Sequence, residues 1–500
     1  MSSKGGVLVV DIGTESIRSA LVNDKGSVVA LEGAGPHFVS PSPGWAEQSP
    51  VEWWDLTCQT IRSLLHSNPD FDVLAIGVGA QMHAVIPLDK KGEVLLERVP
   101  IWCDKRSENV CREIREKLSP DEQVTKAANL LLPAWTGPKM RWVKANQPEV
   151  YEQTDVFLTA KDYINFRLTG ERYTDHSEAS GSFLYSWENR DWDEELLEIF
   201  GLEQEKLPNI ISSAEVVGKI LPAVAEELAI RSEIPVICGA GDMLCLLLGA
   251  GMTRHGASCD VTGTAADVSV FSPRPLLTQR LMNLHHAVEG WISFGILDSG
   301  GGSMKWLRDA IFRQEEHKIS YADIDKIAGR VPAGSEGLLF FPYLMGERLL
   351  GSSLARGSYF GILPGHDIKH FARSVMEGVC FDLKMSLDEI EKLYQGNIRE
   401  MSIIGGGANS DLWCQIKADV YEKEMYTLTE AEGGIVGAAL LAFSALGNYT
   451  VADIASGWLR EKKRFVPTFA NQKYYRSQYR LFCEFHRIFQ EAYRFYGEQE

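Results

Sequence analysis

The chain has 500 residues, of which 45% are hydrophobic and 24% are charged. This composition is typical of globular proteins of about two to four domains, and it excludes disordered, fibrous and small disulfide-stapled proteins. With 50 Lys and Arg against 68 Asp and Glu, the net charge is −18. Such a charge disfavours nucleic acid as a partner, because that binding depends on cationic side chains. Nine scattered cysteines without a CxxC pair, and apolar segments too short to span a membrane, predict a soluble cytoplasmic protein.

Short apolar runs that end in a small or polar residue predict strands in several parts of the chain. The runs are residues 7–10, 73–78, 235–238, 259–262 and 401–404. Apolar residues at three- and four-residue spacing predict helices over residues 50–65, 148–168 and 368–393. This alternation of strands and helices indicates a mixed α/β architecture.

The first predicted strand runs into Asp11-Ile12-Gly13-Thr14. Glycine lets the backbone approach a phosphate, threonine offers donors, and a carboxylate at a strand end can hold a hydrated cation. The pattern predicts a hairpin that binds phosphate and Mg²⁺, with an ordinary Gly-containing β-hairpin as the alternative. Glu15 adds a carboxylate beside this turn, which is unfavourable next to phosphate unless it points away or reaches the metal.

Polar and aromatic side chains follow two further strand ends. Gln81-Met82-His83 comes after residues 73–79, and Trp102-Cys103-Asp104 comes after Ile101. A tryptophan face together with amide, imidazole and carboxylate groups suits a sugar pocket. For the histidine, a purely structural role is the alternative.

Asp242 follows Gly239-Ala240-Gly241 where a predicted strand meets a helix. A carboxylate at such a corner either caps the helix or serves as the base that takes a proton from an attacking hydroxyl. Both interpretations stay open at this point.

A second strand and turn, Asp260 to Thr264, repeats the order of Asp and Gly-Thr about 250 residues after the first. This repeat predicts two similar halves, with a boundary in residues 249–258 and domains at 1–255 and 256–500. Two Gly-rich corners, residues 298–306 and 402–408, indicate either a nucleotide lying on bare backbone or plain packing. Neither matches a P-loop or a Rossmann fingerprint.

Taken in order, these motifs resemble the FGGY carbohydrate kinases, and among them most closely the xylulokinases. The resemblance extends over about residues 7–445 and includes residues 44–48, Trp53-Trp54, residues 342–348, residues 357–362 and residues 370–377. It implies a two-domain actin-like ATPase (ribonuclease H-like) fold with a central cleft. It also implies ATP-dependent phosphorylation of a sugar, with D-xylulose preferred and D-xylulose 5-phosphate as product.

The resemblance implies a role for each matching residue. Asp242 is expected to be the general base, and Asp11 the carboxylate associated with Mg²⁺. The sugar is expected to contact Gln81, Met82, His83, Trp102, Asp104 and Asp242. ATP is expected to contact Gly13, Thr14, Gly263, Thr264, Gly301, Gly302, Lys305, Gly406, Gly407 and Asn409.

Departures from the family pattern leave alternatives open. The family commonly has Thr or Ser at Glu15, and xylulokinases usually have Gly at Ala84. Another ketose, a polyol or a sugar acid is therefore an alternative substrate, and a degenerate nucleotide-dependent sugar sensor is an alternative function. Residues 474–496 predict an amphipathic helix that docks on the body or on a second subunit, with a nucleic-acid stacking surface as the alternative. A homodimer is the expected oligomer by base rate.

Overall fold

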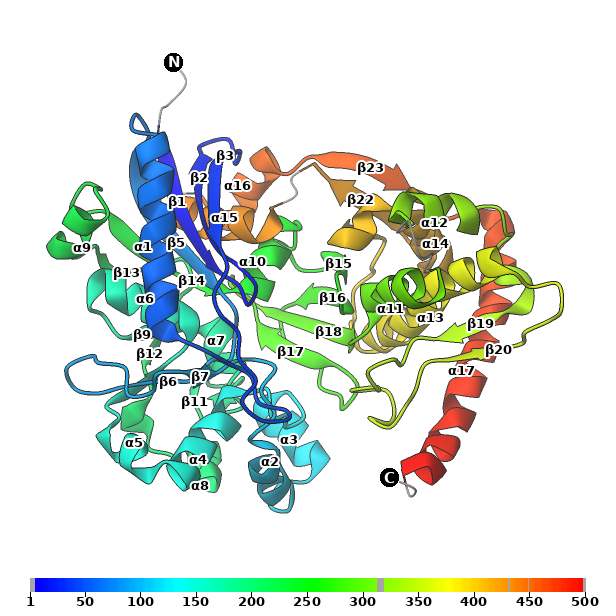
Figure 1. Ribbon diagram of the computed structural model, residues 1–500, viewed down its shortest axis with the longest axis horizontal. Coiled ribbons are helices and arrows are strands. Elements are labelled where there is room, and N and C mark those ends of the chain that lie inside the picture. The colour runs from blue at the N-terminus through cyan, green and yellow to red at the C-terminus, as the bar shows by residue number, and fades with distance from the viewer. Residues whose placement is uncertain (1–4, 313–318, 430–431, 448, 498–500) are drawn as a thin grey trace.

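The computed structural model describes residues 5–312, 319–429, 432–447 and 449–497. It contains two mixed β-sheets, each covered by helices, which form two lobes side by side in Figure 1. None of the helices in these ranges is long and apolar enough to cross a membrane.

The first sheet has six strands in the order β13-β14-β5-β1-β2-β3. Strands β1, β2 and β3 are antiparallel neighbours, whereas β5 and β14 run parallel to β1. The side chains of β1 are buried from Gly6 to Ile12, as expected for a strand covered on both faces. The strands are β1 (Gly5–Ile12), β2 (Ile17–Asn23), β3 (Val28–Ala34), β5 (Asp72–Ala80), β13 (Val216–Lys219) and β14 (Pro235–Gly241).

The second sheet has seven strands in the order β17-β18-β16-β15-β21-β22-β23. Its strands β15, β16 and β18 are antiparallel neighbours, and β21 and β22 run parallel to β15. The five central strands therefore repeat the topology of the first sheet, which confirms the predicted duplication. The strands are β15 (Ser258–Thr262), β16 (Ala266–Ser272), β17 (Met282–His285), β18 (Trp291–Leu297), β21 (Glu400–Ile404), β22 (Glu424–Leu428) and β23 (Glu461–Phe465).

Helices cover both sheets and supply the rest of the core. They are α1 (Pro50–Ser67), α2 (Glu108–Arg115), α3 (Pro120–Ala127), α4 (Thr136–Asn146), α5 (Pro148–Gln153), α6 (Ala160–Thr169), α7 (His176–Ser180), α8 (Glu194–Phe200), α9 (Pro222–Glu227), α10 (Asp242–Gly249), α11 (Gly300–Trp306), α12 (Tyr321–Ala328), α13 (Ile368–Leu393), α14 (Asp411–Tyr421), α15 (Gly433–Leu446), α16 (Val451–Trp458) and α17 (Phe469–Gly497). Helices α1 and α13 begin and end within two residues of their predicted bounds.

Helix α15 comes from the second half of the sequence but packs on the first sheet. It contacts α10, β1 and β5, and Figure 1 shows it in the same lobe as β1. Its buried residues Ala438 and Ala442 lie against Gly77 of β5, where an added side chain would collide with Ala438. The boundary that we propose near residue 255 lies between α10 and β15, while α15 joins the cores of the two halves.

The expectation of one helix over residues 148–168 is wrong. Residues Val156–Leu158 form a strand, β8, which pairs with β6 (Ile86–Leu88) and separates α5 from α6. Thr159 and Asp162 then form a capping box that starts α6. The apolar spacing runs through the interruption because both the strand and the two helices are buried, so periodicity alone does not reveal it.

The remaining short strands lie in small two-stranded sheets outside the main ones. They are β4 (Glu47–Gln48), β7 (Val99–Pro100), β9 (Tyr173–Asp175), β10 (Tyr185–Ser186), β11 (Asp191–Trp192), β12 (Asn209–Ile211), β19 (Leu339–Phe341) and β20 (Ser358–Phe360).

The aromatic C-terminal segment forms α17 and docks on the body of the second lobe, at the right of Figure 1. Phe482 is fully buried and stacks on Phe341 of β19, with ring centroids 4.6 Å apart. The Tyr475 hydroxyl donates to Glu377 of α13 at 2.9 Å. These rings face the protein interior, which disfavours the alternative of a nucleic-acid stacking surface.

Candidate functional site

Three parallel strands of the first sheet deliver predicted site residues to one edge. Ile12 of β1 lies opposite Ala80 of β5, and Ala80 lies opposite Gly241 of β14. The next residue of each strand is Gly13, Gln81 and Asp242 respectively. Ligands of α/β proteins bind at the carboxyl ends of parallel strands, so this edge is the candidate catalytic site.

Asp242 is the first residue of α10, and its Oδ1 accepts a hydrogen bond from the backbone N–H of Met243 at 2.7 Å. Burial and the nearby negative charge of Asp11 raise the pKa of its carboxyl to about 7. The carboxyl thus lies at the start of a helix, as the helix-capping interpretation predicts. Its pKa also suits a general base that works near neutral pH.

Asp11 is paired with a cation that the sequence analysis did not identify. Arg18 lies opposite Asp11 in the β1–β2 hairpin, and its Nε and Nη2 donate to Asp11 Oδ2 at 3.0 and 2.5 Å. Its Nη1 donates to Glu432 Oε2 at 2.6 Å, which ties the hairpin to the segment before α15. Burial raises the pKa of the Asp11 carboxyl, and Arg18 opposes that shift. The seven-residue spacing across a tight hairpin was the signal in the sequence.

Thr14 and Gln81 belong to one hydrogen-bond network. The Thr14 hydroxyl donates to Gln81 Oε1 at 3.1 Å and accepts from Trp102 Nε1 at 2.9 Å. Gln48 donates to the Thr14 carbonyl and accepts from Gln81 Nε2. The amide of Gln81 is therefore engaged by the protein, whereas the ring of Trp102 is 44% exposed and held in place through its nitrogen. Glu15, the residue after Thr14, is exposed to solvent.

Met82 and His83 lie against the neighbouring strand and α7. Met82 lies over Gly241, where any side chain would collide with it. His83 has a φ of 66°, its ring packs edge-on against Trp135, and its buried Nδ1 has no hydrogen-bond partner among the described residues. Burial, with Lys139 nearby, lowers the pKa of His83 to about 3, so the imidazole is neutral.

Lys139 is fully buried and fixes the loops that carry the predicted sugar residues. Its ammonium donates to the carbonyls of His83, Ile101 and Ala134 at 2.9, 2.8 and 2.8 Å. Burial lowers its pKa to about 7. One buried cation therefore joins the segment after β5 to the segment after β7.

Asp104 is buried and makes several contacts with the protein itself. It accepts from the Ala46 backbone N–H at 2.7 Å and from the guanidinium of Arg106 at 2.8 and 2.9 Å. Arg106 in turn lies 3.8 Å from the ring centroid of Trp45. These contacts position the loop after β7, and sugar binding by Asp104 stays a prediction.

Glu178 of α7 was also missed, because no local motif points to it. It is buried, and neither of its carboxylate oxygens has a hydrogen-bond partner among the described residues. Burial, with the negative charges of Asp162, Asp175 and Asp242 nearby, raises the pKa of its carboxyl well above the ordinary value. An extra carboxyl group thus lies in the surroundings of Asp242.

The phosphate turn of the second half is held from both sides. Asp260 of β15 is buried, pairs with Lys417 of α14 and accepts from Thr262 Oγ1 and from Tyr421 at 2.8 Å each. The backbone N–H of Gly301 donates to the carbonyl of Gly263 at 2.9 Å, so the start of α11 closes on the turn. A side chain at Gly301 would overlap that carbonyl, so only glycine allows this approach.

The predicted nucleotide residues of the second half line a single pocket of about 540 Å³. They are Gly263, Thr264, Gly301, Gly302, Lys305, Gly406, Gly407 and Asn409. Tyr321 and Asp325 of α12 also line it, and no motif in α12 predicts this from the sequence. Bare glycine backbone on one wall and Trp413 and Met376 on another suit a nucleoside phosphate.

The repeated topology and the pocket beside the second Gly-Thr turn define a two-domain actin-like kinase. Comparison with protein-family models matches residues 6–249 to the N-terminal domain, and residues 261–446 to the C-terminal domain, of the FGGY family of carbohydrate kinases. The chain belongs to the FGGY family and is a xylulokinase-like carbohydrate kinase.

Individual relatives include enzymes for two kinds of sugar. The chain is 30% identical to a xylulose kinase of Bacillus subtilis over 483 residues, which is 95% of each chain. It is 28% identical to a gluconokinase of the same organism, over 97% of this chain and 96% of the relative. Among solved structures, a ligand-bound xylulose kinase of Lactobacillus acidophilus has a TM-score of 0.92 at 26% identity and covers 98% of this chain and 100% of its own.

Proposed function

We propose that the protein phosphorylates a neutral ketose with ATP as the phosphoryl donor, and that D-xylulose is the preferred substrate. The observation that carries the proposal is the position of Asp242, whose carboxyl has a pKa of about 7 at the strand ends that also present Gly13 and Gln81. Phosphoryl transfer needs positioning and a group that takes the hydroxyl proton, rather than covalent chemistry by the protein.

In the proposed reaction the ionised carboxylate of Asp242 accepts the proton of one sugar hydroxyl. The hydroxyl oxygen forms a bond to the γ-phosphorus, and the bond from that phosphorus to the bridging oxygen breaks, which releases ADP. The backbone N–H groups of Thr14 and Thr264 are the proposed donors for the phosphate oxygens, since those of Gly13 and Gly263 donate to the carbonyls of Ser16 and Ala265 within the turns. Arg18 adds a guanidinium next to the first of these turns.

The residues present fit ATP and Mg²⁺. Mg²⁺ is usually bound through one or two carboxylates together with waters and phosphate oxygens. Asp11 and Asp242 are two carboxylates close enough for the charge of Asp11 to raise the pKa of Asp242. When bound, the cation would neutralise charge that develops on the transferred phosphoryl group. The pocket beside Gly263 and Gly301 would hold the nucleoside.

Charge around Asp242 favours a neutral sugar over a sugar acid. The negative charge of Asp11 lies near Asp242, and a substrate carboxylate would meet repulsion from it. The cations that contact the predicted sugar residues are engaged by the protein, since Lys139 has three carbonyl acceptors and Arg106 has Asp104 and Glu47. A ketose needs no cation, so this arrangement supports D-xylulose rather than gluconate.

A substrate panel tests the proposal. ADP release from ATP and Mg²⁺ is measured with D-xylulose, D-gluconate and glycerol, with the Asp242→Asn variant as the background for ATP hydrolysis. We expect D-xylulose to give the highest kcat/KM. A higher value for D-gluconate would overturn the choice of sugar, and ADP release that no sugar on a wider panel of ketoses, polyols and sugar acids stimulates would favour the nucleotide-dependent sensor.

A further inference from the structure

The guanidinium of Arg18 is shared between two carboxylates that lie far apart in the sequence. Its Nε and Nη2 donate to Oδ2 of Asp11 at 3.0 and 2.5 Å, and its Nη1 donates to Oε2 of Glu432 at 2.6 Å. Both contacts with Asp11 use Oδ2, and Oδ1 accepts no hydrogen bond from the described part of the chain. Arg18 therefore holds one oxygen of Asp11 and leaves the other for a further ligand.

The fold fixes the position of Glu432. This residue lies directly before α15, and its side chain makes no hydrogen bond to the first turn of that helix. The start of α15 packs closely on α10, since a β-carbon at Gly249 would overlap the carbonyl of Gly433. A negative charge is favoured at the N-terminus of a helix. Glu432 is thus a carboxylate that a closely packed helix pair presents to Arg18.

The Arg18–Glu432 pair is half-exposed, whereas Asp11 is nearly buried. The side chains of Arg18 and Glu432 are 30% and 37% exposed, and ion pairs of this kind contribute little to folding. The side chain of Asp11 is only 9% exposed, so its interactions are less screened by water. Loss of the Glu432 carboxylate is therefore expected to affect the interactions of Asp11 more than the stability of the protein.

Arg18 and a cation compete for Asp11. A guanidinium on one carboxylate oxygen repels a Mg²⁺ ion on the other, because the two positive charges are only a few ångströms apart. Glu432 gives Arg18 a second acceptor, so the guanidinium depends less on Asp11. With an amide in place of the Glu432 carboxylate, Asp11 alone would balance the charge of Arg18.

We propose that Glu432 is a positioning residue that shares Arg18 with Asp11, weakens its hold on Asp11 and so lowers the Mg²⁺ concentration that nucleotide binding requires. The inference rests on the function proposed above, in which Asp11 is the carboxylate associated with Mg²⁺. The effect of Glu432 passes through Arg18, so it disappears when the guanidinium is removed.

Calorimetric titration of the full chain with ADP, at a series of free Mg²⁺ concentrations, tests the proposal without any sugar. The quantity compared is the free Mg²⁺ concentration at which half of the tightening of ADP binding is reached. Glu432→Gln is expected to raise this concentration at least about threefold, as expected for loss of a half-exposed ion pair. Its Tm without Mg²⁺ is expected to change by less than about 2 °C.

A double-mutant cycle with Arg18→Gln separates positioning from a direct effect of charge. In the Arg18→Gln background, Glu432→Gln is expected to leave the Mg²⁺ dependence unchanged, because no guanidinium remains to be shared. An equal shift in both backgrounds would mean that Glu432 attracts the cation directly, and it would overturn the proposal. Should Arg18→Gln not fold, Arg18→Lys takes its place, since one ammonium cannot bridge two carboxylates as the guanidinium fork does. The effect of Glu432→Gln is then expected to be smaller than in wild type.

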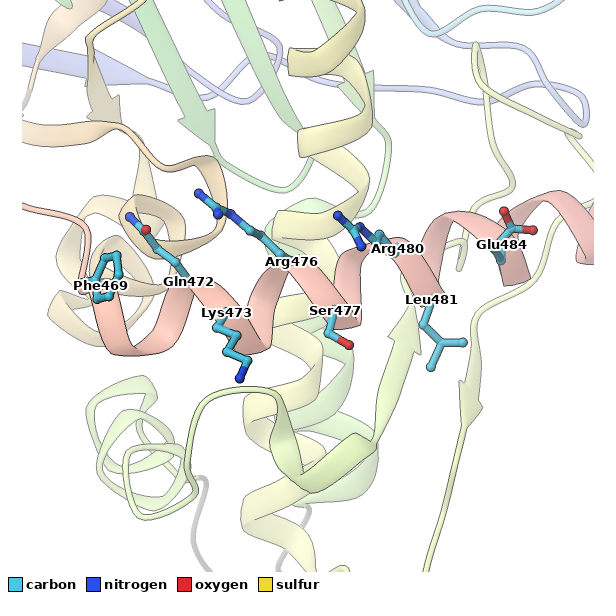
Figure 2. A pocket seen from close by; sticks show the side chains of 8 residues that line it. All are labelled: Phe469, Gln472, Lys473, Arg476, Ser477, Arg480, Leu481 and Glu484. Atoms are coloured by element: carbon cyan, nitrogen blue, oxygen red, sulfur yellow. The ribbon is translucent and has the colours of Figure 1, made fainter.

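Glu484→Gln is the matched control, because it neutralises another glutamate that pairs with an arginine. Glu484 is exposed, borders the hollow along α17 in Figure 2 and pairs with Arg487 at 3.2 Å. Its replacement is expected to leave the Mg²⁺ dependence unchanged. A Mg²⁺ dependence that Glu432→Gln does not shift would overturn this inference alone. A wild type that binds ADP equally well with and without Mg²⁺ would overturn both the inference and the proposed role of Asp11.

Discussion

Asp11 near the end of β1 and Asp242 directly after β14 lie on either side of β5, and the negative charge of Asp11 adds to burial in raising the pKa of Asp242. Neither residue is near the other in sequence, and the parallel pairing of β1, β5 and β14 brings them to one edge. The energetic consequence is that two carboxyl groups resist being ionised together without a cation. A cation bound at this edge would therefore favour the ionised form of both.

The first prediction concerns the role of Asp242 in the reaction. Asp242→Asn removes the proton acceptor but keeps the size of the side chain and an oxygen for the Met243 N–H. We expect kcat with D-xylulose to fall about 10²–10⁴-fold, the usual contribution of a general base. ATP binding, measured by calorimetry, is expected to persist. Asp191→Asn is the control, since Asp191 accepts from its own neighbouring N–H at 2.7 Å but is exposed. Turnover near the wild-type rate in Asp242→Asn would refute the assignment of the base.

The second prediction concerns pH. The carboxyl of Asp242 has a raised pKa of about 7 in the folded state, against an ordinary value of about 4 in the unfolded chain. Between about pH 4 and pH 7 the folded state therefore binds more protons, and this group makes folding less favourable as the pH rises through that window. Above about pH 7 the ionised Asp242 carboxylate destabilises the folded state by its full amount. In the same pH range this carboxylate is available as a base.

Two measurements follow for wild type and Asp242→Asn. The wild-type kcat/KM is expected to rise with pH to a plateau above about pH 7. The Tm of Asp242→Asn, relative to wild type, is expected to increase from about pH 5 to pH 8, because the amide has no charge to desolvate. A difference in Tm that stays constant over this range would mean that the pKa of Asp242 is not raised by folding.

The third prediction concerns Lys139, which holds three carbonyl groups around the predicted sugar residues. Lys139→Met leaves these three buried carbonyl groups without a hydrogen-bond donor, which lowers the free energy of unfolding by about 1–3 kcal/mol for each. This loss is partly offset because the variant no longer buries a charged ammonium group. We expect Tm to fall by several degrees and the KM for the sugar to rise, with the KM for ATP unchanged. Lys326→Met is the control, at an exposed lysine paired with Asp323 on the same helix. A rise in the KM for ATP alone would contradict the role proposed for Lys139.

The nucleotide pocket and the strand ends were predictable from the sequence because short motifs encode them. Gly-rich corners and Gly-Thr turns place backbone N–H groups, and backbone geometry depends on adjacent residues. Thus Gly263, Thr264 and Gly301, chosen from motifs, line one pocket with the five other nucleotide residues predicted in the second half. The long helix α13 was equally predictable, because it is amphipathic over its whole length.

The contacts that occupy predicted sugar residues were not predictable in this way. The amide of Gln81 bonds to Gln48, which lies 33 residues away, and Asp104 accepts from Ala46, 58 residues away. Such pairs depend on how distant segments pack, and residue type at one position does not specify the partner. The interruption of the expected helix at residues 148–168 has the same cause, since β8 pairs with β6, about 70 residues earlier in the chain.

The fourth prediction concerns Gly301, whose N–H holds the second phosphate turn. A β-carbon at this position would overlap the carbonyl of Gly263, so Gly301→Ala forces α11 away from the turn. We expect the KM for ATP to rise at least about tenfold, a loss of about 1.4 kcal/mol in binding, while sugar binding is unchanged. Gly457→Ala is the control, because that glycine lies in α16 and a β-carbon there meets no atom within 4 Å. It is expected to leave the kinetics unchanged and to raise stability by up to about 1 kcal/mol. If both variants kept the wild-type KM for ATP, the pocket beside Gly263 would not be the nucleotide site.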